Sequence, residues 1–177
     1  MSREELETLI SDYGKDIYSF CCQITRSRHG ADDLYQDTFL KMLEVKDRLD
    51  IKENPKSYLL SVAVNLWKNQ TRKAAWRQRI TGCACSVEES GLEVPSDEAT
   101  AEEQMISQEE QVCVRRAVDA LPEKYRVPVL LFYMEELKIY EIAGILKLPQ
   151  GTVKSRLYKA KKVLKKELEV VLDEKRH

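Results

Sequence analysis

Cationic side chains gather in two parts of the chain, and both parts could bind the phosphates of a nucleic acid. Residues 51–85 hold 7 basic residues and 1 acidic residue, a net charge of +6. Residues 137–177 hold 11 basic and 5 acidic residues, again a net charge of +6. Residues 1–50 have a net charge of −4, and residues 86–111 have 9 acidic and no basic residues. The overall charge of −1 therefore conceals two basic blocks that are compatible with two contacts to DNA.

The remaining residue types that could do chemistry form no recognisable site. The five cysteines are Cys21, Cys22, Cys83, Cys85 and Cys113. Their spacing fits no zinc pattern, and neither His29 nor His177 lies near a suitable ligand set. We interpret the cysteines as reduced thiols, and a redox or metal role for Cys83 and Cys85 with Cys113 is the alternative. The chain has no phosphate-binding glycine motif and no Ser/His/Asp set, so we expect no enzyme activity, no cofactor and no metal.

Hydrophobic periodicity indicates the elements that must position the basic side chains. The chain has only 6 Gly and 5 Pro, and its apolar residues recur at helical spacing, which predicts an all-α protein. We expect the first helix, at 6–28, to be one helix or two short ones, with a break at His29-Gly30-Ala31. Asp32 or Asp33 would then cap the next helix. The further helices are expected at 32–46, 56–79, 108–120, 123–134, 137–147 and 150–170.

The predicted helices form two small domains. We expect a helical bundle at 5–80 and a second helical domain at 108–172. Residues 80–104 lose the periodicity and carry most of the acidic block, so we interpret 81–107 as a flexible acidic linker. The chain contains no apolar run near the roughly 18 residues that span a bilayer, and its N-terminus lacks the features of a signal peptide. We therefore expect a cytoplasmic protein that is not itself a membrane protein.

A short helix, a tight turn and a longer helix follow one another in residues 137–168. Small Ala143 would allow close helix approach, and Leu148 in the turn would fill the core. The apolar side of the second helix recurs at i, i+4, i+7 and i+11, from Val153 to Leu164. The side facing away carries Lys154, Ser155, Tyr158, Lys159, Lys161 and Lys162. A helix fits the major groove of DNA, so we favour a DNA-binding helix-turn-helix over an amphipathic hairpin with a solvated lysine face.

Specific strings in both domains are similar to a known family. Leu-Pro-Glu-Lys-Tyr-Arg at 121–126 and Gly-Thr-Val-Lys-Ser-Arg-Leu at 151–157 resemble region 4 of bacterial sigma factors. The strings DDLYQDTFLKML (32–43) and NPKSYLLSVAVNLWKNQTRK (54–73) resemble region 2. With the two regions in this order and no further domain expected, the chain resembles the extracytoplasmic-function (ECF) sigma factors. The chain departs from the family at Pro149-Gln150, where a better helix cap is common, so promoter preference is expected to differ.

The resemblance implies a factor that binds RNA polymerase core enzyme and directs promoter-specific transcription initiation. It also implies promoter DNA and an anti-sigma factor as partners, and no small-molecule substrate. The helix at 32–46 would bind core polymerase, with Tyr35 and Phe39 turned inward. Its outward side chains would be Asp33, Gln36, Asp37 and Leu40.

The same resemblance assigns two DNA elements. The −10 element would be bound by residues 47–79, with an unpaired base in the loop 49–57 and Asn65 reading a base edge. Backbone phosphates there would be neutralised by Lys68, Arg72 and Lys73. The −35 element would be contacted by Lys154, Ser155, Tyr158 and Lys159, while Arg156 would either reach a phosphate or brace the domain. Tyr58 and Trp67 are favoured as core residues over stacking platforms, and the role of Trp76 stays open.

Two questions remain open at this point, the role of the linker and the class of transcription factor. The linker could thread the channels of polymerase as a mimic of nucleic acid, or it could be a solvated tether. It could also cover the basic surfaces in the free protein. A conventional transcription regulator would share the helix-turn-helix, but it would need a sensing or phosphoacceptor domain, and residues 1–80 show no βα alternation.

Overall fold

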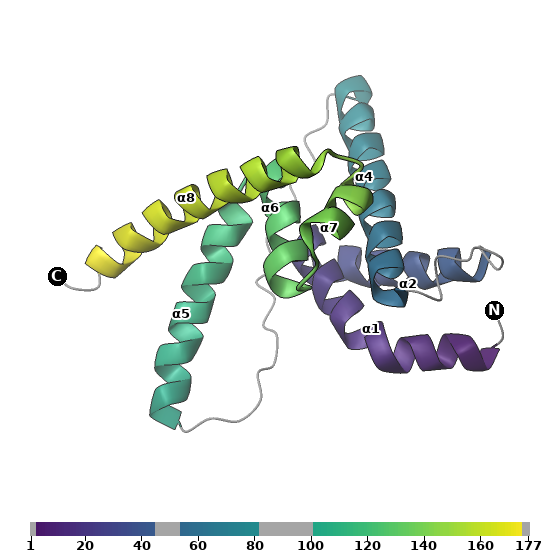
Figure 1. The fold of residues 1–177 in the computed structure, drawn as a ribbon, viewed down its shortest axis with the longest axis horizontal. Coiled ribbons are helices and arrows are strands. Elements are labelled where there is room, and N and C mark those ends of the chain that lie inside the picture. The colour runs from purple at the N-terminus through teal and green to yellow at the C-terminus, as the bar shows by residue number, and fades with distance from the viewer. Residues whose placement is uncertain (1–2, 45–53, 82–100, 175–177) are drawn as a thin grey trace. The chain divides into compact units, whose positions relative to one another are not determined.

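The described part of the chain is built from helices. The computed structural model describes residues 3–44, 54–81 and 101–174, and within these ranges all regular structure is helical (Figure 1). The elements are α1 (Arg3–Thr25), α2 (Arg28–Glu44), α4 (Pro55–Thr81), α5 (Ala101–Ala120), α6 (Glu123–Val129), the π-helix η1 (Leu130–Met134), α7 (Ile139–Leu146) and α8 (Gln150–Glu174). The all-α prediction is therefore confirmed. The chain divides into two compact units, mainly residues 1–92 and mainly residues 93–177.

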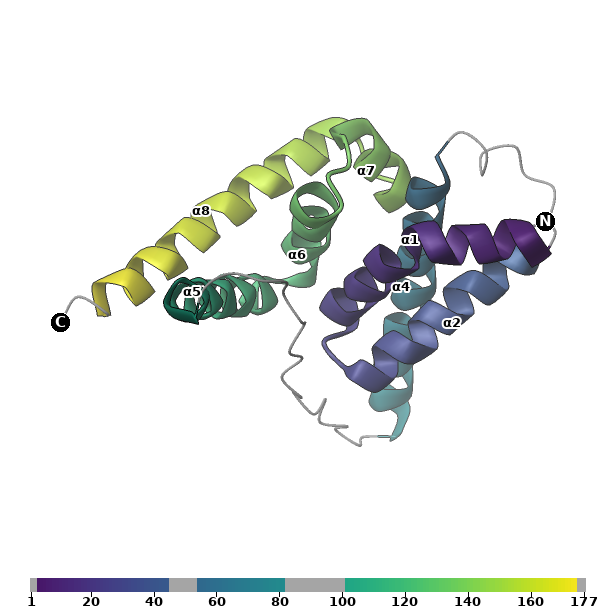
Figure 2. The same cartoon turned by 90° about the horizontal axis from the view of Figure 1, so that it is seen from below.

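The first unit is a bundle of α1, α2 and α4. Helix α2 packs against both α1 and α4, and α1 also contacts α4, as Figure 2 shows. Each helix contributes apolar side chains at helical spacing to one shared core. The fully buried large side chains of this core include Ile17, Phe20, Ile24, Leu34, Met42, Leu59, Leu60 and Val64. This core holds α2 and α4 in fixed positions, and these two helices carry the candidate surfaces of the unit.

The junction between α1 and α2 lies earlier than the sequence indicated. Arg26 takes a left-handed conformation with φ of 57° and ends α1. Ser27 caps α2, because its Oγ accepts a hydrogen bond from the Gly30 N–H at 3.3 Å and its carbonyl accepts one from the Ala31 N–H at 2.8 Å. The predicted break at His29-Gly30-Ala31 and the predicted cap by Asp32 or Asp33 are therefore wrong. The serine side chain satisfies the Gly30 N–H in the first turn, so glycine there does not interrupt the helix.

Asp32 has a different role, which is to join α2 to α1. The Tyr18 hydroxyl donates a hydrogen bond to Asp32 Oδ1 at 2.8 Å. This bond to a carboxylate, together with partial burial, raises the pKa of Tyr18 to about 12 from an ordinary value of 10.0. The folded protein therefore holds the Tyr18 proton more tightly than the unfolded chain does. The resulting stabilisation is fully present below pH 10 and is lost as the pH rises towards 12.

Tyr18→Phe is expected to lower the free energy of unfolding by about 1–2 kcal/mol at pH 7, because the Asp32 carboxylate loses its donor. Urea denaturation of the two proteins measures the difference, which should shrink as the pH rises from 10 to 12. Tyr13→Phe on the same helix is the matched control and should change stability by less than about 0.5 kcal/mol. Equal stability of the Tyr18→Phe variant and the parent at pH 7 would contradict the prediction.

The second unit contains α5 to α8. Helix α8 packs against α5 and α6. One cluster of its core consists of buried Leu121, Val129 and Ala160, with Val118, Tyr125, Leu157 and Leu164 packed against it. Helix α5 begins at Ala101, so residues 101–107, which were expected in the linker, belong to a helix. Residues 82–100, which hold the rest of the expected acidic linker with Cys83 and Cys85, lie outside the described residues.

The helix expected at 123–134 changes its winding part-way. Helix α6 gives way to the π-helix η1, whose widened turn is marked by the hydrogen bond from the Glu135 N–H to the Leu130 carbonyl at 3.2 Å. Pro128 is buried just before this point and has no N–H with which to continue the regular α-helical pattern. The wider turn leads the chain into the segment that begins α7.

In the described ranges of the chain, no helix is long and apolar enough to cross a membrane. The same ranges contain no group of three or more His, Cys, Asp or Glu side chains placed to hold a metal ion. Within the described residues, Cys21 and Cys22 are buried, Cys113 is half-buried, and none of the three forms a disulfide.

Candidate nucleic-acid and protein interfaces

One face of α2 is acidic and exposed, and the other face belongs to the core. Ala31, Leu34, Thr38, Phe39 and Met42 are buried. The side chains predicted to face outward are all exposed, and they recur at i, i+3, i+4 and i+7, which places them on one stripe of the helix. We call this stripe the α2 stripe, and it consists of Asp33, Gln36, Asp37 and Leu40.

The α2 stripe combines negative charge with one large apolar side chain. Leu40 is the large apolar side chain of this stripe, and it is 58% exposed. His29 Nε2 lies 3.5 Å from Asp33 Oδ2. Asp37 Oδ2 accepts a hydrogen bond from Gln70 Nε2 of α4 at 3.3 Å. Of the two residues expected to turn inward, Phe39 is buried and Tyr35 is half-buried against it, with ring centroids 4.9 Å apart. An exposed leucine beside carboxylates suits the binding of another protein rather than of a phosphate backbone.

Helix α4 is partly buried in its first half and mostly exposed in its second half. Asn54 begins it, because its Oδ1 accepts a hydrogen bond from the Ser57 N–H at 3.1 Å, and Lys56 Nζ pairs with Asp16 Oδ2 of α1 at 2.8 Å. The first half then enters the core, where Trp67 is only 5% exposed. Trp67 is therefore a core residue, as predicted, whereas Tyr58 is half-buried. The expected base pocket at 49–57 falls mostly on residues outside the described ranges.

The second half of α4 presents cations to solvent. Asn65 and Lys68 are half-buried, while Arg72 and Lys73 are exposed. Asn65, Lys68 and Arg72 follow one another at spacings of three and four residues, so they lie along one side of the helix, with Lys73 at its margin. Arg72 Nη2 donates a hydrogen bond to Asn69 Oδ1 at 3.1 Å, which holds the guanidinium against the helix. We call Asn65, Lys68, Arg72 and Lys73 the α4 stripe.

The second unit contains the expected helix-turn-helix in α7 and α8. Helix α7 is capped at its start, where Glu141 Oε2 accepts the Lys138 N–H at 2.8 Å. It ends where Lys147 takes a left-handed φ of 56°, and the Leu148 N–H returns to the Ala143 carbonyl at 3.0 Å. The Pro149 carbonyl then accepts the first N–H groups of α8. The proline therefore begins the helix without a side-chain cap, as the sequence indicated.

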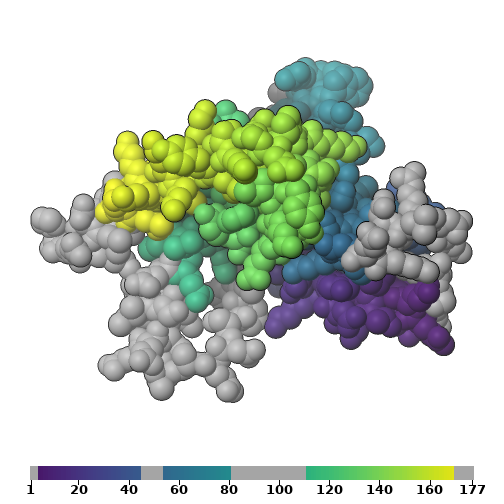
Figure 3. All heavy atoms as spheres, viewed as in Figure 1, coloured from purple at the N-terminus to yellow at the C-terminus, as the bar shows by residue number. Residues whose placement is uncertain are grey.

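The two helices bury one side each and expose the other. Ile142, Ala143, Leu146, Val153 and Ala160 are buried, in agreement with the predicted apolar faces. The candidate DNA contacts Lys154, Ser155, Tyr158 and Lys159 are all exposed, and Figure 3 shows α8 at the surface of the molecule. Lys162 Nζ lies 4.8 Å from the centroid of the Tyr158 ring, so the aromatic ring supports a further cation on the same face. Ser155 Oγ donates to the Thr152 carbonyl at 2.9 Å, and Arg156 is half-buried.

Comparison with known proteins assigns both units. The family model Sigma-70 region 2 matches residues 9–77, and the model Sigma-70, region 4 matches residues 111–164. The chain belongs to the sigma-70 family. The resemblance inferred from the sequence is thereby confirmed, and the protein is an RNA polymerase sigma factor, an initiation factor and not an enzyme.

Several relatives of this sigma factor are ECF proteins. The ECF RNA polymerase sigma factor SigW of Bacillus subtilis is 28% identical over 162 residues, covering 90% of this chain and 87% of SigW. SigX of the same organism is 24% identical over 172 residues, covering 97% of this chain and 87% of SigX. The sigma-E factor of Salmonella typhimurium is 28% identical over 135 residues, covering 75% of this chain and 70% of that protein. These matches support the ECF class.

Two solved structures share the fold of this sigma factor. RpoE of Bartonella quintana, solved with the anti-sigma factor NepR, superposes with a TM-score of 0.76 at 22% identity, covering 96% of this chain and 99% of RpoE. CnrH, solved with the cytosolic domain of CnrY, gives a TM-score of 0.65 at 16% identity, covering 96% of this chain and 90% of CnrH. At these identities the likeness concerns the fold.

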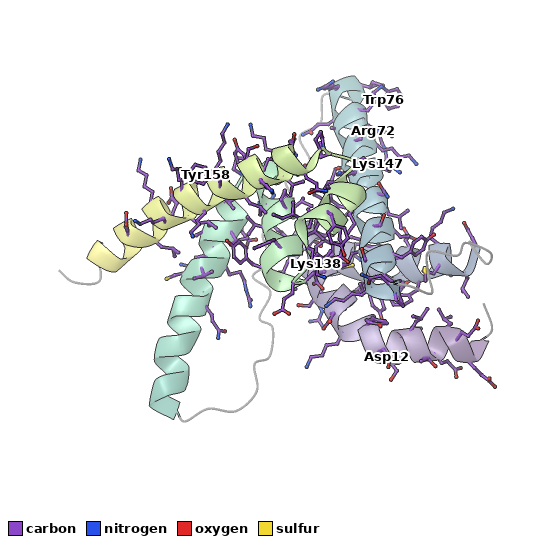
Figure 4. The ribbon with its side chains drawn as sticks, viewed as in Figure 1. Asp12, Arg72, Trp76, Lys138, Lys147 and Tyr158 are labelled. Atoms are coloured by element: carbon purple, nitrogen blue, oxygen red, sulfur yellow. The ribbon has the colours of Figure 1, made fainter. Side chains whose placement is uncertain are left out.

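Sequence reasoning missed three exposed residues around the helix-turn-helix of this sigma factor. Lys138 precedes α7, and its Nζ lies 6.0 Å from the centroid of the exposed Tyr140 ring. Lys147 is exposed in the turn between α7 and α8, and Figure 4 labels Lys138, Lys147 and Tyr158. The signal for Lys147 was its place directly after the last apolar residue of α7, where a helix commonly ends in a left-handed residue.

Proposed function

We propose that the two units divide the work of promoter recognition. The first unit, residues 5–80, binds core RNA polymerase and the −10 element, and the second, residues 108–172, binds the −35 element. The observation that carries this proposal is the presence, on two packed helices of one unit, of the acidic α2 stripe and the cationic α4 stripe. A protein surface and a nucleic-acid surface thus lie on one rigid bundle.

The α2 stripe is our proposed contact to core polymerase. Asp33, Gln36 and Asp37 provide charge and hydrogen-bonding groups at the rim, and Leu40 provides apolar area for burial. All four side chains are exposed, so they are available without rearrangement of the bundle.

The α4 stripe is our proposed contact to the opened −10 element. Lys68, Arg72 and Lys73 would neutralise phosphates of the single strand, and Asn65 would read a base edge with its amide, which can both donate and accept hydrogen bonds. The partial burial of Asn65 supports this role, because a half-buried amide keeps a defined orientation.

The exposed face of α8 is our proposed contact to the −35 element. Lys154, Ser155, Tyr158 and Lys159 would enter the major groove, and their position in the first turns of the helix after a tight turn supports this. Arg156 is half-buried, which favours bracing of the domain over a phosphate contact.

An anti-sigma factor is the further partner that we propose. Two proteins of the same fold were solved with NepR and with the cytosolic domain of CnrY. A partner that covers the α2 stripe would compete with core polymerase and keep the sigma factor inactive. Binding to polymerase and DNA also implies that the protein acts in the cytoplasm.

Transcription with purified components tests the proposal. Core polymerase alone is not expected to initiate at a cognate promoter, and addition of the full chain should give a specific start. The promoter can be found by sequencing the transcripts that this holoenzyme makes from the DNA of the source organism. A requirement for a second sigma factor would show that the chain acts as an accessory regulator, and would contradict the proposal.

A further inference from the structure

The outer turns of α4 carry an exposed tryptophan that the proposed contacts leave unused. Trp76 is 65% exposed and Ile80 is 63% exposed, and every residue from 72 to 80 is exposed. Figure 4 shows Trp76 and Arg72 on the outer turns of this helix. Trp67, nine residues earlier on the same helix, is 5% exposed and already serves the core. Among the described residues of the first unit, Trp76 is therefore not part of the core.

The position of Trp76 continues the α4 stripe. It follows Arg72 by four residues, so Asn65, Lys68, Arg72 and Trp76 lie in sequence along one side of the helix. Lys73 precedes Trp76 by three residues and Arg79 follows it by three, so cations flank the ring at both ends. Residues 55–81 contain no acidic side chain. A polyanion is the partner that this charge distribution favours.

The combination of an exposed aromatic ring and flanking cations indicates which kind of polyanion this surface would bind. A flat apolar ring exposed between cations matches a chain in which phosphates alternate with flat bases, because the base can stack on the ring while the phosphates meet the cations. A base within a duplex is already stacked on its neighbours, so only an unpaired base can use the ring. An acidic protein would satisfy the cations, but it would not require an aromatic ring.

We propose that Trp76 is a stacking platform for an unpaired base of the opened promoter strand, with Arg72, Lys73 and Arg79 binding the flanking phosphates. This inference rests on the proposed function of α4 and extends it. Trp76 lies roughly 16 Å beyond Asn65 along the helix axis, at 1.5 Å per residue. That distance exceeds several base steps of about 3.4 Å, so Trp76 binds a different nucleotide from the one that Asn65 reads.

Three substitutions of Trp76, tested in holoenzyme assembled from core polymerase and the full chain, examine the proposal. Trp76→Ala should weaken binding to a promoter with a pre-opened −10 region about tenfold, which corresponds to about 1.4 kcal/mol and lies within the range for one stacked base. Trp76→Tyr should restore binding to within about twofold, because tyrosine keeps an aromatic face. Trp76→Leu should behave like Trp76→Ala. The dependence of binding on salt should be the same for all three, since no phosphate contact is lost.

Two results would overturn the stacking role. In the first, Trp76→Leu binds as well as the parent, so that apolar bulk is enough. In the second, Trp76→Ala weakens core binding or duplex binding as much as it weakens binding to the pre-opened promoter. Because Trp76 is exposed, the thermal melting of the variants should match the parent, which excludes misfolding as a cause.

A parallel variant separates this inference from the proposed function. Arg72→Ala with Lys73→Ala should weaken binding and make it less dependent on salt. If that variant behaves so while Trp76→Ala is unaffected, the stacking role fails and the proposed role of α4 stands. If the parent holoenzyme does not initiate at all, the proposed function itself fails.

Discussion

Replacing Asp33 and Asp37 together by lysine is expected to weaken binding of core polymerase by about 100-fold or more. The change reverses the charge of the α2 stripe, and like charges brought together at an interface cost several kcal/mol, with each 1.4 kcal/mol worth a factor of ten. Both carboxylates are exposed, so the free energy of unfolding should change by less than about 1 kcal/mol. Titration of fluorescently labelled sigma factor with core polymerase measures the affinity, and urea denaturation measures the stability.

A matched variant on α1 controls for the change in total charge. Glu4→Lys with Asp12→Lys alters the charge by the same amount on exposed residues outside the α2 stripe, and Figure 4 shows Asp12 on that helix. This control should bind core polymerase with nearly the affinity of the parent. If both double variants lose affinity equally, the effect belongs to overall charge, and the assignment of the α2 stripe is wrong. Leu40→Ser in the same assay should show a smaller loss from the apolar contact.

Replacing Lys154 and Lys159 together by glutamate is expected to weaken binding of the holoenzyme to a promoter by about 100-fold at low salt. Both side chains are exposed on the face of α8 that carries Tyr158 and Ser155. The logarithm of affinity should also fall less steeply with the logarithm of salt concentration, by about one unit for each phosphate contact that is lost. Binding measured at several salt concentrations gives both quantities.

A control double variant and two single variants test whether this loss of binding is specific to Lys154 and Lys159. Arg116→Glu with Lys124→Glu reverses two exposed charges on α5 and α6, outside the exposed face of α8, and should leave the salt dependence nearly unchanged. The single changes Lys154→Ala and Lys159→Ala, tested on a library of promoters, separate phosphate contacts from base contacts. Loss of a phosphate contact weakens all sequences alike, whereas loss of a base contact changes the preference at one position. No change in promoter binding for either lysine would contradict the −35 assignment.

Periodicity predicted the long helices well because their apolar faces are complete. The expected helix at 56–79 is α4 at Pro55–Thr81, and the expected 150–170 extends to Glu174 in α8. The predicted helix boundaries were wrong where a local hydrogen bond determines where a helix begins or how it is wound. Gly30 was given too much weight as a helix breaker, although Ser27 caps the helix just before it. The change from α6 to the π-helix η1 depends on the hydrogen bond from the Glu135 N–H to the Leu130 carbonyl, which the spacing of apolar residues does not show.

The candidate binding surfaces were predicted mainly from the resemblance to the family, whereas the helices were predicted from hydrophobic periodicity. Resemblance to the family implied the roles of Asp33, Leu40 and Asn65, whereas hydrophobic periodicity had already placed Lys154 on the outward side of the second helix of the helix-turn-helix. Trp67 and Trp76 show the limit of this reasoning. Trp67 was predicted to be a core residue and is buried, whereas the role of Trp76 stayed open until the packing of the bundle showed that its side chain is exposed. The left-handed conformation of Lys147 was missed because the sequence allows this turn geometry but does not require it.

Helix α4 is a single element of 27 residues that is anchored in the core at one end and exposed at the other. A small tilt of such a helix at its anchored end produces a larger displacement at its exposed end. Trp67 and Trp76 are roughly 14 Å apart along its axis, so a tilt of about 5° at the core would move the outer turns by roughly 1 Å. A displacement of that size is enough to misplace a contact to a base. Substitutions in the core, far from any nucleotide, could therefore shift promoter choice, and in this unit the evolution of the core and of DNA specificity would be coupled.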